Sequence, residues 1–162
     1  MKRLFLIRDI VDDYIDKIIV DKSKNVVAIK KNEYTHSYGT ASLAQLLAEV
    51  RGLDIEMAGV IGHLHDIGRI MYNILDETHA KVSAKEAEGI LNNVDVFSVD
   101  EIKLICNAIE QHSNKTIIGG EYEELIKDAD IMERYLCDRQ RFANEDEGNR
   151  IPKVKEELFL KA

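Results

Sequence analysis

The sequence predicts an all-α fold in one domain, and three observations support this. The chain has 162 residues, and a single domain commonly holds about 100 to 200. It contains one proline and nine glycines, which are few turn-forming residues for the many tight turns of an all-β fold. Apolar residues recur at three- and four-residue spacing along most of the chain, as on the buried face of a helix. We therefore expect a helical bundle.

The first expected helix follows the N-terminus. Its apolar stripe is Leu4, Ile7, Val11, Tyr14, Ile15, Ile18 and Ile19. Ser23 to Asn25 breaks this pattern, and the apolar run Val26–Ile29 that follows is compatible with a strand or with part of a helix. The next stripe begins at His36 and continues through Thr40, Leu43, Leu47 and Val50, until Gly52 supplies a helix stop.

Four further helices are expected along the rest of the bundle. Asp54 can cap a helix that ends around residues 66–68, and a connection over 69–78 leads to a helix that begins near His79. Ser98 or Asp100 can cap the next helix, which ends near His112, and the last runs over 121–137. We expect residues 1–137 to form the domain, with its core over 36–137, and 138–162 to form a charged C-terminal extension.

Composition narrows the classes of function. A net charge of −8 disfavours broad binding to nucleic acid or to anionic lipid, because such binding depends on Lys and Arg contacts to phosphate. No apolar stretch approaches the roughly 20 residues of a membrane span. The two cysteines, Cys106 and Cys137, form no CxxC motif and lie in apolar helical contexts, so we expect reduced thiols in the core of a cytoplasmic protein.

Three histidines fall on the inward stripes of different helices: His36, His65 and His112. A fourth, His79, starts another helix, and Asp66 directly follows His65. Burying several imidazoles and carboxylates costs several kcal/mol unless each is hydrogen-bonded or bound to a cation. A divalent metal accepts neutral imidazole and ionised carboxylate together, so the set points to a metal site. The fifth, His63, lies about 200° around the helix from His65 and is expected behind the site or on the surface.

These residues, in this order, resemble the HD-domain superfamily of metal-dependent phosphohydrolases. The resemblance spans residues 36–136 and rests on His36, on the pair His65-Asp66 and on a carboxylate in the stretch Asp128-Ala129-Asp130. The segments around His79 and His112 are similar to the extra histidine segments of its dinuclear branches. Small bacterial diadenosine tetraphosphate hydrolases look most similar.

The resemblance implies a ligand set. His36, His65, Asp66 and Asp130 would hold one metal, Asp66 would bridge to a second, and His79 and His112 would complete the second site. Asp130 is preferred because it forms an Ala-Asp pair with Ala129, and Asp128 is the alternative. One or two divalent ions are implied, drawn from Fe, Mn, Ni, Zn and Mg, since ligand type limits the metal without selecting it.

Two metals would activate a water molecule and stabilise charge on a phosphoryl group. Asp66 and Arg69 are the expected catalytic residues. Arg69 and Lys81 are the expected contacts to substrate, because each lies close in sequence to an expected ligand. For Lys115 an ordinary solvated charge is the preferred interpretation.

The favoured function is therefore hydrolysis of a phosphoester or phosphoanhydride of a nucleotide or dinucleotide polyphosphate. A di-iron oxygenase of the HD type and a non-catalytic nucleotide-binding module are the alternatives. The expected partner is a small phosphoester, without bulk binding to nucleic acid or membrane, and a homodimer is possible.

Overall fold

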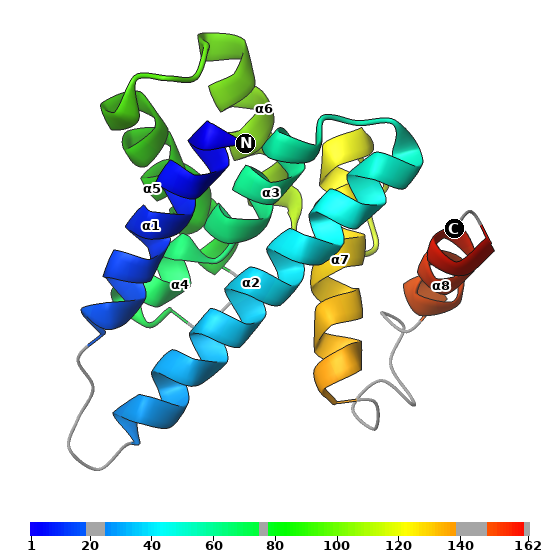
Figure 1. Ribbon diagram of the computed structural model, residues 1–162, viewed down its shortest axis with the longest axis horizontal. Coiled ribbons are helices and arrows are strands. Elements are labelled where there is room, and N and C mark those ends of the chain that lie inside the picture. Colours follow the sequence, from blue (N-terminus) through cyan, green and yellow to red (C-terminus); the bar gives the residue numbers. More distant parts are fainter. Residues whose placement is uncertain (19–24, 75–77, 139–148, 161–162) are drawn as a thin grey trace.

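The computed structural model describes residues 1–18, 25–74, 78–138 and 149–160 (Figure 1). All of the regular structure in these ranges is helical, which confirms the all-α prediction. The helices are α1 (Lys2–Asp16), α2 (Val26–Arg51), α3 (Ile55–Leu64), α4 (Ile67–Tyr72), α5 (His79–Val94), α6 (Val99–Gln111), α7 (Glu121–Cys137) and α8 (Arg150–Leu160).

Helix α2 is the longest element and crosses the middle of the bundle (Figure 1). It packs against α3 and α7, while α5 pairs with α6 and α1 lies against α3. Helix α8 lies beyond α7, on the side away from α1 and α5 (Figure 1). Helices α2, α3, α4, α5, α6 and α7 together surround the histidines that the sequence analysis singled out.

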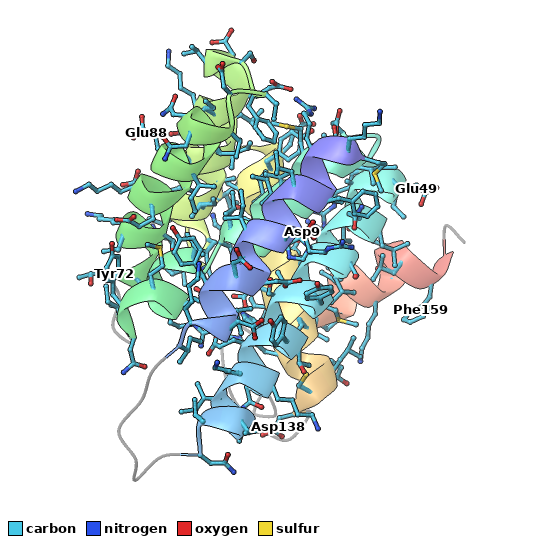
Figure 2. All side chains as sticks on the ribbon, turned by 60° about the vertical axis from the view of Figure 1, so that its left-hand side comes forward. Asp9, Glu49, Tyr72, Glu88, Asp138 and Phe159 are labelled. Carbon is cyan, nitrogen blue, oxygen red and sulfur yellow. The ribbon has the colours of Figure 1, made fainter. Side chains whose placement is uncertain are left out.

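The core has two parts. The larger cluster joins α1, α3, α4, α5 and α6 through residues such as Ile7, Ile61 and Ile105, all fully buried. The smaller cluster joins α2, α7 and α8 and includes Leu47 and Ile151. The charged residues Asp9, Glu49 and Glu88, labelled in Figure 2, lie on outer faces of their helices. The periodicity of the sequence thus corresponds to real buried faces.

Local signals fix the ends of several helices. Asp54 accepts a hydrogen bond from the Met57 backbone N–H and begins α3 as predicted. Ser98, rather than Asp100, caps α6 and forms a reciprocal capping box with Glu101. Gly52 ends α2 with φ +70°, a left-handed conformation that glycine adopts without strain.

Two glycines allow close approach at the centre of the bundle. A Cβ atom at Gly62 would lie 2.5 Å from Cα of Ala41, so glycine lets α3 contact the backbone of α2. A Cβ at Gly68 would lie 2.7 Å from the backbone nitrogen of Ser83, and the Gly68 N–H donates to Ser83 Oγ at 3.0 Å. These contacts bring His36, Asp66 and His79 within reach of one another.

The structure decides one open alternative and corrects other expectations. Of the two alternatives for the run Val26–Ile29, the structure has the helix: the run begins α2, so His36 lies in the third turn and not at the start of its helix. Residues expected to be a plain connection after Gly68 include most of α4. The expected first helix ends at Asp16, and its Ile19 lies outside the described residues.

The charged C-terminal segment contributes to the packed fold. Ile151 and Val154 of α8 are buried against α2 and α7, while Phe159 projects outward with 72% of its surface exposed (Figure 2). Residues 150–160 of the predicted extension therefore pack against the rest of the fold. The domain boundary at residue 137 stays a prediction.

Candidate metal centre

Six side chains converge at the centre of the bundle. His36 comes from α2, His65 and Asp66 from the junction of α3 and α4, His79 from the first residue of α5, His112 from the end of α6, and Asp130 from α7. His36, His65 and Asp66 form one group that could hold a metal ion, and Asp66, His79 and His112 form a second. Asp66 belongs to both.

The two oxygens of Asp66 face different groups. Oδ2 lies 3.4 Å from His36 Nε2 and 3.6 Å from His65 Nε2. Oδ1 lies 3.5 Å from Nε2 of His79 and 3.5 Å from Nε2 of His112. Asp130 joins the first group, since its Oδ1 lies 3.5 Å from His36 Nε2. One carboxylate therefore stands between two histidine pairs.

Hydrogen bonds on the far side of three imidazoles fix their orientation. Nδ1 of His65 lies 2.7 Å from the Gly62 carbonyl oxygen, and Nδ1 of His112 lies 2.7 Å from the Ile109 carbonyl oxygen. Nδ1 of His36 lies 2.6 Å from Glu133 Oε2. Because these partners only accept, each Nδ1 carries a proton and Nε2 is the ring nitrogen that faces the cluster.

The donor set fits a pair of cations. The Nε2 atoms of His36 and His65 lie 3.1 Å apart, as do those of His79 and His112. Two donors that share one ion at about 2.1 Å lie about 3.0 to 3.4 Å apart at tetrahedral or octahedral angles. Asp66 Oδ1 is buried and accepts no hydrogen bond of ordinary geometry from the described residues. Lone pairs facing each other at these distances repel unless a positive charge lies between them.

The pKa values of His65, Asp66 and His36 are consistent with a site that binds cations. Burial lowers the pKa of His65 to about 3, which keeps this ring neutral, as a metal ligand must be. Burial opposes the ionisation of Asp66, but His65, His112, His36 and Arg69 lower its pKa well below the usual value. Burial also lowers the pKa of His36, yet hydrogen bonds to Asp66 and Glu133 outweigh it and raise the pKa to about 10. The carboxylates thus favour a positive charge at His36 Nε2, from a proton or from a metal ion.

Three cationic side chains surround the cluster. Arg69 Nε lies 2.9 Å from Asp66 Oδ2, and Arg69 Nη2 lies 2.9 Å from Glu33 Oε2. Lys115 Nζ lies 2.5 Å from Asp130 Oδ2, and Arg134 Nε lies 3.8 Å from Asp130 Oδ1. They offset part of the negative charge of the carboxylates.

A cavity of about 370 Å³ opens onto the cluster. Its lining includes His36, Asp66, His79, His112 and Asp130 together with Asn32, Glu33, Arg69 and Arg134. A second cavity of about 280 Å³ adjoins it and shares Asn32, His36 and Arg134. The metal centre is therefore accessible to a ligand larger than a phosphate group.

Some residues singled out in the sequence lie elsewhere. Asp128 points to the other side of α7, where Arg51 and Arg150 pair with it at 2.7 and 2.8 Å, so it takes no part in the cluster. Lys81 is exposed on α5 and does not line the cavity at the metal centre. His63 is 5% exposed and bonds to Ser37 Oγ at 3.0 Å, which makes it a core residue and not a surface one.

The sequence analysis also missed several residues of the site. Lys115, interpreted as a solvated charge, has a side chain that is 6% exposed and paired with Asp130. Glu133 and Arg134 follow Asp130 by one helical turn, and this spacing on α7 could have drawn attention to both. Glu33 had no comparable signal, because its pairing with Arg69 depends on the packing of α2 near α4.

The cysteines offer no competing nucleophile. Cys137, expected in the core, is exposed and donates a hydrogen bond to Glu133, which raises the pKa of its thiol to about 11. Burial raises the pKa of the Cys106 thiol to about 11 as well. Both groups are therefore protonated at neutral pH.

Comparison with known proteins points in the same direction. Ribonuclease Y of Fusobacterium nucleatum is 29% identical over 102 residues, which make up 63% of this chain and 18% of that protein. Ribonuclease Y 2 of Bdellovibrio bacteriovorus is 34% identical over 77 residues, 44% of this chain and 15% of that protein. Ribonuclease Y of Acetivibrio thermocellus is 25% identical over 138 residues, 85% of this chain and 25% of that protein. The chain thus spans a quarter or less of the length of these curated relatives.

These relatives are ribonucleases by name, and not diadenosine tetraphosphate hydrolases. Their name counts in part against the expectation that this chain has no bulk binding to nucleic acid. No solved structure matches the chain. Among the described residues, none of the helices has the length and apolar character needed to cross a membrane.

Residues 34–135, well over half of the chain, match the family described as "HD domain". The chain therefore belongs to the HD-domain family.

Proposed function

We propose that this HD domain is a di-metal phosphohydrolase that cleaves a phosphoester or phosphoanhydride bond in a nucleotide or a short oligonucleotide. One observation carries the proposal. The two oxygens of Asp66 face two different histidine pairs, at distances that suit two neighbouring ions. A single carboxylate between two imidazole pairs is a costly arrangement for a buried site unless cations are bound there.

The ligands follow from the two groups. His36, His65, Asp66 and Asp130 would hold the first ion, and Asp66, His79 and His112 the second. Imidazole and carboxylate donors suit iron, manganese, nickel or zinc better than magnesium, which prefers oxygen ligands. When bound, such a pair activates water near neutral pH and stabilises the charge of the attacking and leaving oxygens in a phosphoryl displacement.

The protein's own residues would orient the substrate. Arg69 and Arg134 both line the cavity at the metal centre, beside Asp66 and Asp130 respectively. A guanidinium group presents several N–H donors in one plane and can bind the non-bridging oxygens of a phosphate. Glu33 and Asp66 hold Arg69 from two sides, so its orientation is set before substrate binds.

The cavities support a substrate larger than inorganic phosphate. The cavity of about 280 Å³ beside the metal centre is lined by Asn32, Thr35 and Asp138 among others, which offer hydrogen bonds. A nucleoside attached to the reacting phosphate could occupy this space. The names of the relatives favour a ribonucleotide chain, whereas the resemblance to diadenosine tetraphosphate hydrolases favours a nucleotide or dinucleotide polyphosphate. Both substrates place a nucleoside beside a phosphate.

The test begins with metal content. Protein purified without chelators is expected to contain about two equivalents of metal per chain, measured by elemental analysis, because two ligand groups are present. The protein is then assayed with diadenosine tetraphosphate, with short single-stranded RNA and with bis-p-nitrophenyl phosphate. Turnover of at least one, lost in Asp66→Asn, supports the proposal. Absence of metal after anaerobic reconstitution with iron or manganese contradicts it.

A matched control separates the site from the fold. Asp128→Asn changes the same residue type two positions before Asp130 on α7, outside the cluster, and is expected to keep metal and turnover, because the amide oxygen of asparagine still accepts from Arg150. Turnover that persists undiminished in Asp66→Asn, with helical content unchanged by circular dichroism, would reject hydrolysis at this centre.

A further inference from the structure

We propose that Lys115 is a positioning residue for the metal ligand Asp130, and that helix α8 holds Lys115 in place through Arg150. The inference rests on the proposed function, because it takes Asp130 to be a ligand. It assigns a role at the centre to the loop between α6 and α7 and to the C-terminal helix.

The first link joins Lys115 to Asp130. The ammonium nitrogen of Lys115 lies 2.5 Å from Asp130 Oδ2, while Asp130 Oδ1 lies 3.5 Å from His36 Nε2. The side chains of Lys115 and Asp130 are 6% and 7% exposed, so water competes little for this contact. Lys115 therefore occupies one oxygen of the carboxylate and directs the other toward the first metal group.

The second link joins Lys115 to α8. Arg150 donates from both Nε and Nη2 to the backbone carbonyl oxygen of Lys115, at 3.1 and 2.8 Å. The third nitrogen of Arg150, Nη1, lies 2.8 Å from Asp128 Oδ1 and 2.9 Å from Glu124 Oε2, both on α7. Arg150 thus fixes the backbone of Lys115 relative to the helix that carries Asp130.

The two links make a short path from the C-terminal helix to the metal centre. Residues 112–120 lie outside the helices, and a lysine side chain on such a loop has many rotamers. The two hydrogen bonds from Arg150 fix the backbone of Lys115, and the ion pair with Asp130 fixes the position of its ammonium group. Lys115 pairs with Asp130 of the first metal group, so we expect its effect at that group and not at the group of Asp66, His79 and His112.

The test measures metal affinity rather than turnover. Metal-free protein is titrated with Co²⁺ or Mn²⁺ in competition with a chromophoric chelator, which yields two dissociation constants in the wild type. Lys115→Met is expected to weaken one of them by about 10- to 100-fold, as loss of a group behind a metal ligand commonly does, and to leave the other unchanged. Lys103→Met, an exposed lysine on α6, is the control and should change neither.

The role of α8 is tested with Arg150→Met and with the double variant. Arg150→Met should weaken the same dissociation constant, and the double variant should lose no more than Lys115→Met alone, because both act through one contact. Lys153→Met, exposed on α8, is the control. Arg150→Met also replaces Lys115→Met as the decisive variant if the latter does not fold.

The outcomes separate the two proposals. A wild type that binds no metal overturns the proposed function. A wild type that binds two ions, with both constants unchanged in Lys115→Met, overturns the positioning role. Equal weakening of both constants also overturns it, because a general loosening of the fold would act on both sites. Additive losses in the double variant overturn the part played by Arg150.

Discussion

The imidazole of His36 and the carboxylate of Glu133 are joined by a hydrogen bond of 2.6 Å between Nδ1 and Oε2. Glu133 lies three residues after Asp130 on α7, so one face of this helix supplies both a ligand candidate and the group behind a second candidate. The side chain of Glu133 is only 7% exposed. The orientation of His36 is therefore set by α7, 97 residues away in sequence.

Glu133→Gln should weaken metal binding at the first group. A glutamine can offer either an oxygen or an NH₂ group to Nδ1, so it no longer enforces the ring form whose lone pair faces the cluster. We expect a loss of about 10- to 100-fold in affinity for one metal. The measurement is a metal titration of the chelator-treated protein, with Glu110→Gln, an exposed residue on α6, as control. Unchanged affinity for both ions would show that the hydrogen bond does not matter for binding.

Arg69→Lys should reduce turnover while the metal content stays near that of the wild type. Lysine keeps the charge but loses the planar pair of donors that now contact Asp66 and Glu33, and it cannot bind phosphate in a bidentate manner. The expected loss in kcat/KM is about 10- to 100-fold, in the range seen when one charge-stabilising donor is removed.

Lys81→Met is the comparison for this experiment. The sequence analysis assigned Lys81 to the substrate, but this residue is exposed and lies outside the lining of the metal-centre cavity. We expect its kinetic constants to match those of the wild type. A rise in KM for Lys81→Met alone would reverse the assignment and place the substrate over α5.

The donor set could be found from the sequence because each histidine continues an apolar stripe or marks a helix end. Periodicity shows that His36, His65 and His112 face inward, and the family resemblance adds His79 and Asp130. Periodicity cannot show which charges face each other across the bundle. Glu33, Lys115 and Glu133 meet their partners only after α2, α7 and the loop after α6 are packed together.

The same limit explains what the sequence left open or missed in the fold. The apolar run at Val26 is too short for periodicity alone to separate strand from helix, and Asn25 as N-cap decides for the helix. Helix α4 has six residues, too few to show a period. Because α8 is rich in charged residues, its sequence did not predict that Ile151 and Val154 are buried. Their burial depends on packing against α2 and α7.

Gly68→Ala should destabilise the protein because its Cβ would meet the backbone of α5 at 2.7 Å. Overpacking of this kind costs about 1 to 3 kcal/mol. Gly89→Ala is the matched control, since nothing lies within 4 Å of a Cβ at this position in α5, and it should stabilise by about 0.5 to 1 kcal/mol. The free energy of unfolding in urea, measured for each variant and for the wild type, checks both expected changes. Equal effects would mean that α4 and α5 adjust to the extra methyl group without cost.

The pH dependence of stability should reveal the contacts of Glu124. Burial by itself raises the pKa of this carboxyl, but hydrogen bonds from Lys127, Gly119 and Arg150 outweigh it and lower the pKa to about 2. A lowered folded pKa contributes stability above the unfolded value of about 4.3, and this contribution is lost as the pH falls toward the folded value.

Glu124→Gln should therefore be less stable than the wild type at pH 7, and the difference should shrink below pH 4 and vanish near pH 2. The free energy of unfolding in urea, measured at pH 7, 4 and 2.5 on chelator-treated protein, checks this. A difference that stays constant across this range would show that the ionised carboxylate contributes nothing to the fold.

Asp128 and Asp130 provide the sharpest comparison in the chain, because the two residues lie on one helix about 200° apart. Asp130 faces His36 and Lys115, whereas Asp128 pairs with Arg51 of α2 and Arg150 of α8. Asp130→Asn should lose metal at the first group and lose turnover, and it should also destabilise the metal-free protein, because the buried ammonium group of Lys115 loses its charged partner. Asp128→Asn should lose about 2 kcal/mol of stability, since two arginines lose their charged partner, and should keep its metal, since the amide oxygen still accepts from Arg150. Elemental analysis gives the metal content of both variants, and urea unfolding gives their free energies of unfolding. Loss of metal in Asp128→Asn but not in Asp130→Asn would assign the metal ligand to Asp128.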